Sequence, residues 1–173
     1  EYSNYGMALL GAILEKVYGT SFEQLVKEKI TQPNGMSSTA VNLSPKQLEL
    51  SCQGHNADGQ ATPAWELNGF VAAGGLHAST RDLLLYLDYN RREPDAATRL
   101  AHQPSFTDRP VMGLAWFIFN TKAGNHLVWH NGATYGFSSF CGYFQEKEIE
   151  ISLLSNYSAS LDPVALSILN HLE

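Results

Sequence analysis

Four short apolar runs in the last third of the chain constrain its fold more than any other feature. The runs are alternating or continuously apolar, as β-strands are, and the linkers between them are short and carry Gly, Asn, Lys or Glu. They are GLAWFIFN (113–120), HLVWHNG (126–132), FSSFCGYF (137–144) and IEISLLSN (149–156). Because short linkers pair neighbouring strands in opposite directions, the pattern predicts an antiparallel meander.

Helical signals lie on both sides of this meander. Apolar residues recur at helical spacing, Gly19 follows the first helix as a stop, and serine caps precede the next ones. The predicted helices cover residues 4–18, Ser21 to about Ile30, a short turn from Ser44, Ser79 to Asn90, and Pro163 to Leu172. Residues 91–110 are polar and broken by prolines.

Together these elements predict an α+β fold in one domain, with a helical part over 1–110 and the strands and last helix over 111–173. One C-terminal helix would leave a thin core for a sheet of this size. Either the early helices cover the sheet or another part of the protein does.

Composition excludes several classes of function. The net charge is −6 and the Lys and Arg residues are scattered, so no basic face for nucleic acid is present. No apolar run is long enough to span a membrane, and the chain does not open with a signal-peptide pattern. Cys52 and Cys141 lack metal-ligand spacing. Cys141 falls in an apolar strand and is predicted to be a buried thiol, with a disulfide left open.

Two polar side chains stand before the first helix. Tyr2 and Asn4 are two positions apart, so extended backbone can point both side chains into one cleft. The phenol can relay a proton, and the carboxamide can orient a substrate carbonyl. Taken alone, Tyr2 reads as a terminal aromatic residue and Asn4 as a helix cap.

A second candidate group is His130-Asn131-Gly132-Ala133 near the end of a predicted strand. The imidazole can bind an anion or share a proton, and the Ala133 N–H can donate to a developing oxyanion. Gly132 removes a side chain that would block this approach. The simpler alternatives are a hydrogen-bonded strand histidine and a glycine bulge. His126 and His130 could share a metal ion, but no third ligand lies at a suitable spacing, so no metal is predicted.

Order and context link the two groups. Tyr-Ser-Asn, then GGLHASTRDLLLYL, then HNGATYGFSSF and a closing strand and helix resemble the serine β-lactamase family, in its branch of class C β-lactamases, D-alanyl-D-alanine carboxypeptidases and esterases. The resemblance spans nearly the whole chain. It implies a β-lactamase/transpeptidase-like fold, with the active site between a helical part and an antiparallel sheet, and no cofactor.

The resemblance also implies residue roles. Tyr2 matches the tyrosine that helps to activate the nucleophile and protonates the leaving group, and Asn4 the asparagine that binds the substrate amide. His130, Asn131 and Gly132 stand where many members have Lys-Thr-Gly and are expected to bind substrate. Ala133 matches the residue whose N–H forms half of the oxyanion hole. A histidine in place of lysine removes a fixed positive charge for a substrate carboxylate.

The family's nucleophile, the serine of Ser-x-x-Lys, has no match, because no serine of this chain has lysine three positions later. The sequence therefore predicts a C-terminal portion of a serine hydrolase that is inactive alone and needs the missing N-terminal part of the same protein. A β-lactam, a D-Ala-D-Ala peptide or a small ester is the expected substrate, and a periplasmic or secreted location is favoured by the resemblance. The alternative is a truncated, non-catalytic homologue that binds a ligand or dimerises through an exposed sheet edge.

Overall fold

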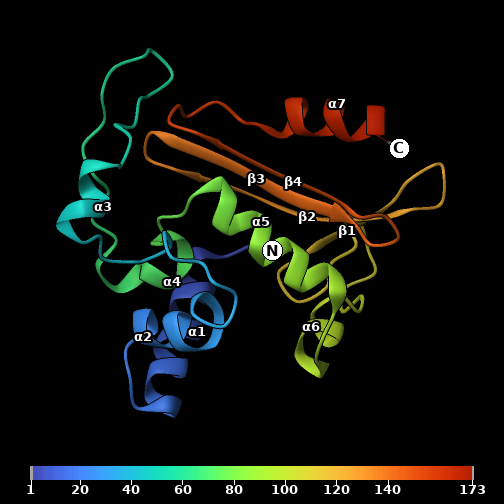
Figure 1. Cartoon of the computed structure of the whole chain (residues 1–173), viewed down its shortest axis with the longest axis horizontal. Coiled ribbons are helices and arrows are strands. Elements are labelled where there is room, and N and C mark those ends of the chain that lie inside the picture. The colour runs from blue at the N-terminus through green and yellow to red at the C-terminus, as the bar shows by residue number, and fades with distance from the viewer. Residues whose placement is uncertain (1, 173) are drawn as a thin grey trace.

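The computed structural model describes residues 2–172, and it has the predicted α+β architecture (Figure 1). Four antiparallel strands follow one another in the order β1-β2-β3-β4, so the predicted meander is confirmed. The strands are β1 (Phe117–Asn120), β2 (His126–Thr134), β3 (Phe137–Phe144) and β4 (Ile149–Ser155). Their bounds agree with the four apolar runs, except that β1 begins four residues later than its run.

Helices cover both faces of the sheet, so of the two alternatives left open by the sequence, an earlier helix provides the second cover. Figure 1 shows α7 (Asp162–Leu172) on one face and α5 (Thr80–Arg92) on the other. Leu127, Phe140 and Ala165 belong to the buried cluster under α7. Leu87, Val128 and Tyr143 belong to the cluster under α5. Because side chains alternate along a strand, even-numbered residues of β2 face α5 and odd-numbered residues face α7.

The first helix, α1 (Asn4–Tyr18), has the predicted bounds, and Gly19 ends it in the left-handed conformation with φ 67°. Its N-cap is Ser3 rather than Asn4: the Ser3 hydroxyl accepts the Gly6 N–H at 3.1 Å. The cap reading of Asn4 is therefore wrong, since a serine one residue earlier already satisfies the first turn.

Much of the apolar surface of α1 has no cover within residues 2–172. The exposed fractions of Leu10 and Val17, two residues of the predicted apolar face, are 46% and 71%. The helix instead packs closely on α4 (Val71–Gly74) at one point, where a Cβ on Gly11 would lie 2.3 Å from the Ala72 Cβ. Only a glycine permits this approach.

The second predicted helix has two parts, α2 (Phe22–Val26) and a π-helical turn, η1 (Lys27–Thr31). The third, α3 (Pro45–Glu49), begins with the predicted capping box of Ser44 and Gln47. A short 3₁₀ turn, η2 (Asn68–Phe70), leads into α4.

Sequence patterns missed α6 (Ala96–Ala101) in the polar stretch between prolines. Asp95 and Thr98 form a capping box at its start. Hydrogen bonds to the Asp95 carboxylate, first from the Tyr89 hydroxyl and next from the Thr98 backbone, lower its pKa to about 2. The helix has only six residues, too few to show the apolar periodicity on which the prediction depended.

Both cysteines are free thiols in the structure. Cys141 is half-buried on the α5 face of β3, and burial raises the pKa of its thiol to about 11. Of the helices within residues 2–172, none combines the length and apolar character that crossing a membrane requires.

Candidate active site

His130 lies within β2 and pairs across the ladder with Cys141. Its ring is half-buried, with its centroid 5.3 Å from that of Phe117. The imidazole Nδ1 lies 2.5 Å from the backbone oxygen of Asn131. Since a carbonyl oxygen only accepts, Nδ1 carries a proton in this contact, which leaves Nε2 as the ring atom that can contact a ligand.

The edge of β2 that faces β1 has no strand partner from His130 onward, because β1 begins at Phe117, which lies opposite Trp129. The Gln145 N–H donates to the His126 oxygen at 2.9 Å, so the even-numbered residues of β2 turn their backbone groups toward β3. The odd-numbered residues turn theirs toward the β1 side. The N–H of Ala133 therefore points out of the unpaired part of the β2 edge, as an oxyanion donor requires.

Gly132 was predicted to leave the approach to the Ala133 N–H free, and it also packs closely against β3. A Cβ at this position would lie 2.7 Å from the Ser139 hydroxyl oxygen on β3. A larger residue here would therefore require the Ser139 side chain to move.

Two residues of an earlier loop, His55 and Thr62, hold the turn between β2 and β3 in place. The His55 N–H donates to the Gly136 oxygen at 3.1 Å, and the Thr62 hydroxyl to the Tyr135 oxygen at 3.3 Å. Gly136 has φ 92°, and a Cβ there would lie 2.2 Å from the Thr62 hydroxyl oxygen. The end of the hairpin next to Ala133 is thus held by loop residues and by a backbone conformation that favours glycine.

Asn131 does not share the face of His130. Its side chain lies on the α7 face and donates from Nδ2 to Asp162 Oδ2 at 2.8 Å. Asp162 is the first residue of α7, and its other oxygen is buried without a hydrogen bond from the described residues. Asn131 therefore ties the candidate edge to α7 instead of pointing toward His130.

Loss of this tie should destabilise the fold. We expect Asn131→Ala and Asp162→Ala each to lower the free energy of unfolding by about 1–3 kcal/mol, because each leaves a half-buried polar group without its partner. In the double variant the two losses should overlap, giving a coupling of about 1 kcal/mol in urea unfolding. Strictly additive losses would show that the contact does not contribute.

Tyr2 and Asn4 lie at the start of α1, and both side chains are exposed. Helix α1 packs on α4, and a Cβ on Gly74 of α4 would be 3.8 Å from Thr134 at the end of β2. Helix α4 thus connects α1 to the candidate edge. Within residues 2–172, however, no hydrogen bond joins Tyr2 or Asn4 to residues 130–133, and the two cavities described below are lined by other residues.

The sequence did not reveal a buried network on the α5 face of the sheet. His102 Nδ1 lies 2.7 Å from Glu93 Oε1, and its Nε2 lies 2.8 Å from the Tyr143 hydroxyl. Burial raises the pKa of the Tyr143 phenol. Glu93 and His102 also line a cavity of about 230 Å³. Tyr143 lies 41 residues after His102, so no local pattern could have predicted this contact.

Metal chemistry has no support from the side chains. Within the part of the chain that the structure describes, no group of three or more His, Cys, Asp or Glu residues is placed to hold a metal ion. His126 instead contacts the Glu146 carboxylate through Nδ1.

Comparisons with known proteins agree on one family. The family model described as Beta-lactamase matches residues 1–171. Penicillin-binding protein 4* of Bacillus subtilis (strain 168) is 25% identical over 90% of this chain and 39% of its own length. D-alanyl-D-alanine-carboxypeptidase/endopeptidase AmpH of Escherichia coli (strain K12) is 26% identical over 86% of this chain and 43% of its own length. The chain thus spans about two fifths of these relatives.

Solved structures show the same fold. A class C beta-lactamase superposes with a TM-score of 0.89 at 23% identity, over 99% of this chain and 57% of its own. An octameric penicillin-binding protein homologue from Pyrococcus abyssi gives a TM-score of 0.84 at 27% identity, over 99% of this chain and 42% of its own.

Proposed function

The chain belongs to the beta-lactamase family, and from this premise we propose that it forms one part of a serine hydrolase that acts through an acyl-enzyme. The observation that carries the proposal is the open edge of β2, where the Ala133 N–H points outward beyond the end of β1. An acyl-transfer enzyme needs such a donor at the carbonyl oxygen, where negative charge develops.

The proposed reaction uses the chain's residues in the following way. A serine hydroxyl attacks the substrate carbonyl, and the Ala133 N–H donates to the resulting oxyanion. The Tyr2 phenol helps to remove the hydroxyl proton and passes a proton to the leaving group. Asn4 orients the amide of the substrate. Water then hydrolyses the acyl-enzyme and releases the acid.

His130 is proposed to contact the acyl group on the α5 face of β2. With Nδ1 donating to the Asn131 oxygen, Nε2 is the ring atom left to contact the acyl group. A histidine at this position, unlike a lysine, has no permanent charge, which is compatible with a β-lactam, a D-Ala-D-Ala peptide or a small ester. AmpH, a relative, is named a D-alanyl-D-alanine carboxypeptidase/endopeptidase.

The nucleophile is proposed to come from residues outside this sequence. No serine here is followed by lysine three positions later, the spacing that places both side chains on one face of a helix. The exposed apolar residues of α1 also support a neighbour that covers them, since apolar surface is normally buried. We therefore propose that the chain alone does not form an acyl-enzyme.

A non-catalytic role is the second candidate, and the open edge of β2 also supports it. Unpaired backbone donors and acceptors on an edge strand can pair with a strand of a second molecule. In that case the chain would bind a ligand or dimerise without turning over a substrate.

Covalent labelling with a fluorescent penicillin tests these proposals. We expect no labelled band from the 173-residue chain after denaturing electrophoresis. A longer protein that contains this chain and an upstream Ser-x-x-Lys should give one, because the serine ester survives denaturation. A label on the chain itself would place the nucleophile within it. If neither protein is labelled, and the longer one cleaves no D-Ala-D-Ala peptide or small ester, the non-catalytic role is favoured.

A further inference from the structure

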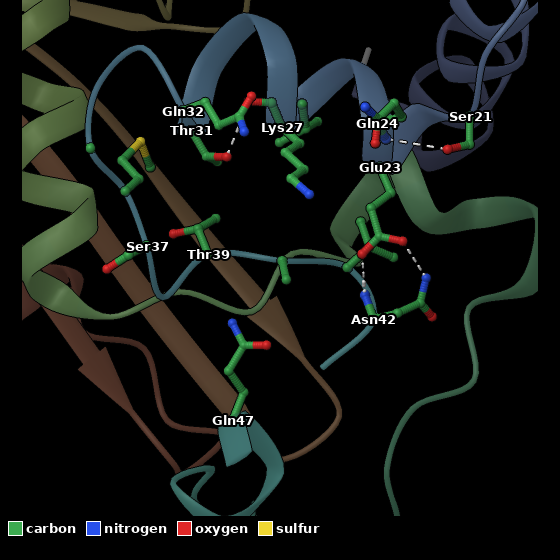
Figure 2. Close-up of a pocket in the computed structure, with 15 residues that line it drawn as sticks. Ser21, Glu23, Gln24, Lys27, Thr31, Gln32, Ser37, Thr39, Asn42 and Gln47 are labelled. Atoms are coloured by element: carbon green, nitrogen blue, oxygen red, sulfur yellow. Dashed lines mark hydrogen bonds between the residues drawn. The ribbon is translucent and has the colours of Figure 1, made fainter. Parts of the chain in front are cut away.

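A second cavity lies away from the candidate active site, between the α2–η1 helix and the segment 36–42 (Figure 2). Its volume is about 600 Å³, and it opens to solvent. This is within the range of cavities that hold small molecules. Three separate parts of the chain contribute its walls: α2 with η1, the segment 36–42, and Gln47 of α3.

One wall of the cavity is an unusual helical turn. In η1 the Gln32 N–H donates to the Lys27 oxygen, five residues back, at 2.9 Å. The buried Thr31 hydroxyl lies 3.4 Å from the same oxygen. Single π-helical turns are rare and occur frequently at functional sites. This turn lies directly beside the cavity, with Lys27 and Thr31 among its lining residues.

Lys27 extends into the cavity instead of forming the ion pair that its position favours. Glu23 precedes it by four residues, the spacing and order at which a glutamate and a lysine on a helix attract each other most. No ion pair within 4.0 Å joins them among the described residues. Figure 2 shows the Lys27 side chain pointing into the open space, and its charge still contributes to lowering the pKa of Glu23.

Asn42 holds Glu23 at the side of the cavity. One carboxylate oxygen accepts the Asn42 N–H at 2.7 Å, and the other accepts its Nδ2–H at 2.6 Å. These bonds, the backbone one first, lower the pKa of Glu23, so it stays ionised at neutral pH. Its oxygens keep free lone pairs for a further donor. The cavity thus has a positive and a negative group on the same wall, Lys27 and Glu23 of the α2–η1 helix.

Gln47 adds a fixed donor opposite Lys27. Its Oε1 accepts the Ser44 backbone N–H at 3.0 Å and the Ser44 hydroxyl at 2.8 Å. Since a backbone N–H can only donate, these contacts assign the oxygen of the amide and leave Nε2 as the other end. Figure 2 shows Gln47 rising toward the cavity, across the open space from Lys27.

We propose that this cavity binds a small zwitterion of the amino-acid type, with its carboxylate at Lys27 and Gln47 and its ammonium group at Glu23. An ammonium and an amide nitrogen on opposite walls suit a carboxylate, which takes charge-assisted bonds from both. The ionised Glu23 disfavours a simple anion and adds a partner for a cation. The site does not share a residue with the proposed hydrolase, so either proposal can fail without the other.

Three related probes test the proposal on the ¹⁵N-labelled chain at constant ionic strength: alanine, propionate, which lacks the ammonium group, and ethylamine, which lacks the carboxylate. Alanine should shift the amide resonances of Lys27–Gln32, Asn42 and Gln47 and bind about tenfold more tightly than either fragment, since only alanine makes both charge-assisted contacts. Equal affinity of the three probes, or no saturable shift with alanine, would overturn the proposal.

Two substitutions assign the contacts. Lys27→Met should weaken alanine binding about tenfold, whereas Lys16→Met, which removes the same charge from exposed α1, should leave it unchanged. Glu23→Gln should reduce the preference for alanine over propionate. An unchanged alanine affinity in Lys27→Met would show that Lys27 does not bind the carboxylate. If a variant lost the dispersed spectrum of a folded protein, the comparison of the three probes on the unmodified chain would still test whether the cavity prefers a zwitterion.

Discussion

Changing Tyr2 to phenylalanine in a longer protein that carries the nucleophile should slow acylation by about 10²–10⁴-fold. This is the range for removal of one positioned group that transfers a proton in the transition state. Phenylalanine keeps the ring and removes only the hydroxyl. Tyr2 is 65% exposed in the chain, so the change should not disturb packing. Single-turnover formation of the acyl-enzyme from a chromogenic β-lactam or ester measures the effect directly.

Tyr5 provides the matched control for this experiment. It lies three residues further along, in the first turn of α1, and is 69% exposed. Tyr5→Phe removes the same hydroxyl from nearly the same place and should leave acylation unchanged. If both variants acylate at the rate of the unmodified protein, Tyr2 has no part in proton transfer and the proposed mechanism loses its base.

The fold was largely readable from the sequence because its core elements have strong periodicity. The run FSSFCGYF became β3 with the same bounds, and residues 4–18 became α1 with the same bounds. Helix α6 was missed because Asp95 and Thr98 define its start by capping alone. Cover of the second face by an early helix was left open, since the sequence does not show that Leu87 of α5 packs on the sheet.

The candidate site was readable only as a set of residue types. The run His-Asn-Gly-Ala could be placed near the end of a strand. The face of the sheet to which each of its side chains points depends on strand register, which the run does not show. Asn131 therefore turned out to contact Asp162 on α7, away from His130. The network of Glu93, His102 and Tyr143 depends on contacts between distant parts of the chain, which single-sequence patterns do not encode.

The largest effect on stability is expected at Asp82, a carboxylate that is only 2% exposed in the first turn of α5. Its backbone N–H donates to the Ser79 hydroxyl at 3.2 Å, and its Oδ2 accepts the Ser38 N–H and the Thr39 hydroxyl, both at 2.8 Å. These bonds tie the segment 36–42, which lines the 600 Å³ cavity, to the helix that covers the sheet.

We expect Asp82→Ala to lower the free energy of unfolding by about 3 kcal/mol, because it removes two hydrogen bonds to a charged acceptor and leaves space in a buried position. Asp82→Asn retains one acceptor oxygen and should lose about half as much. Asp108→Ala, at an exposed position, should stay within about 0.5 kcal/mol of the unmodified chain. Urea unfolding at neutral pH measures all three variants. An Asp82→Ala midpoint equal to that of Asp108→Ala would mean that water replaces the carboxylate without loss, and that the segment 36–42 is held by other contacts.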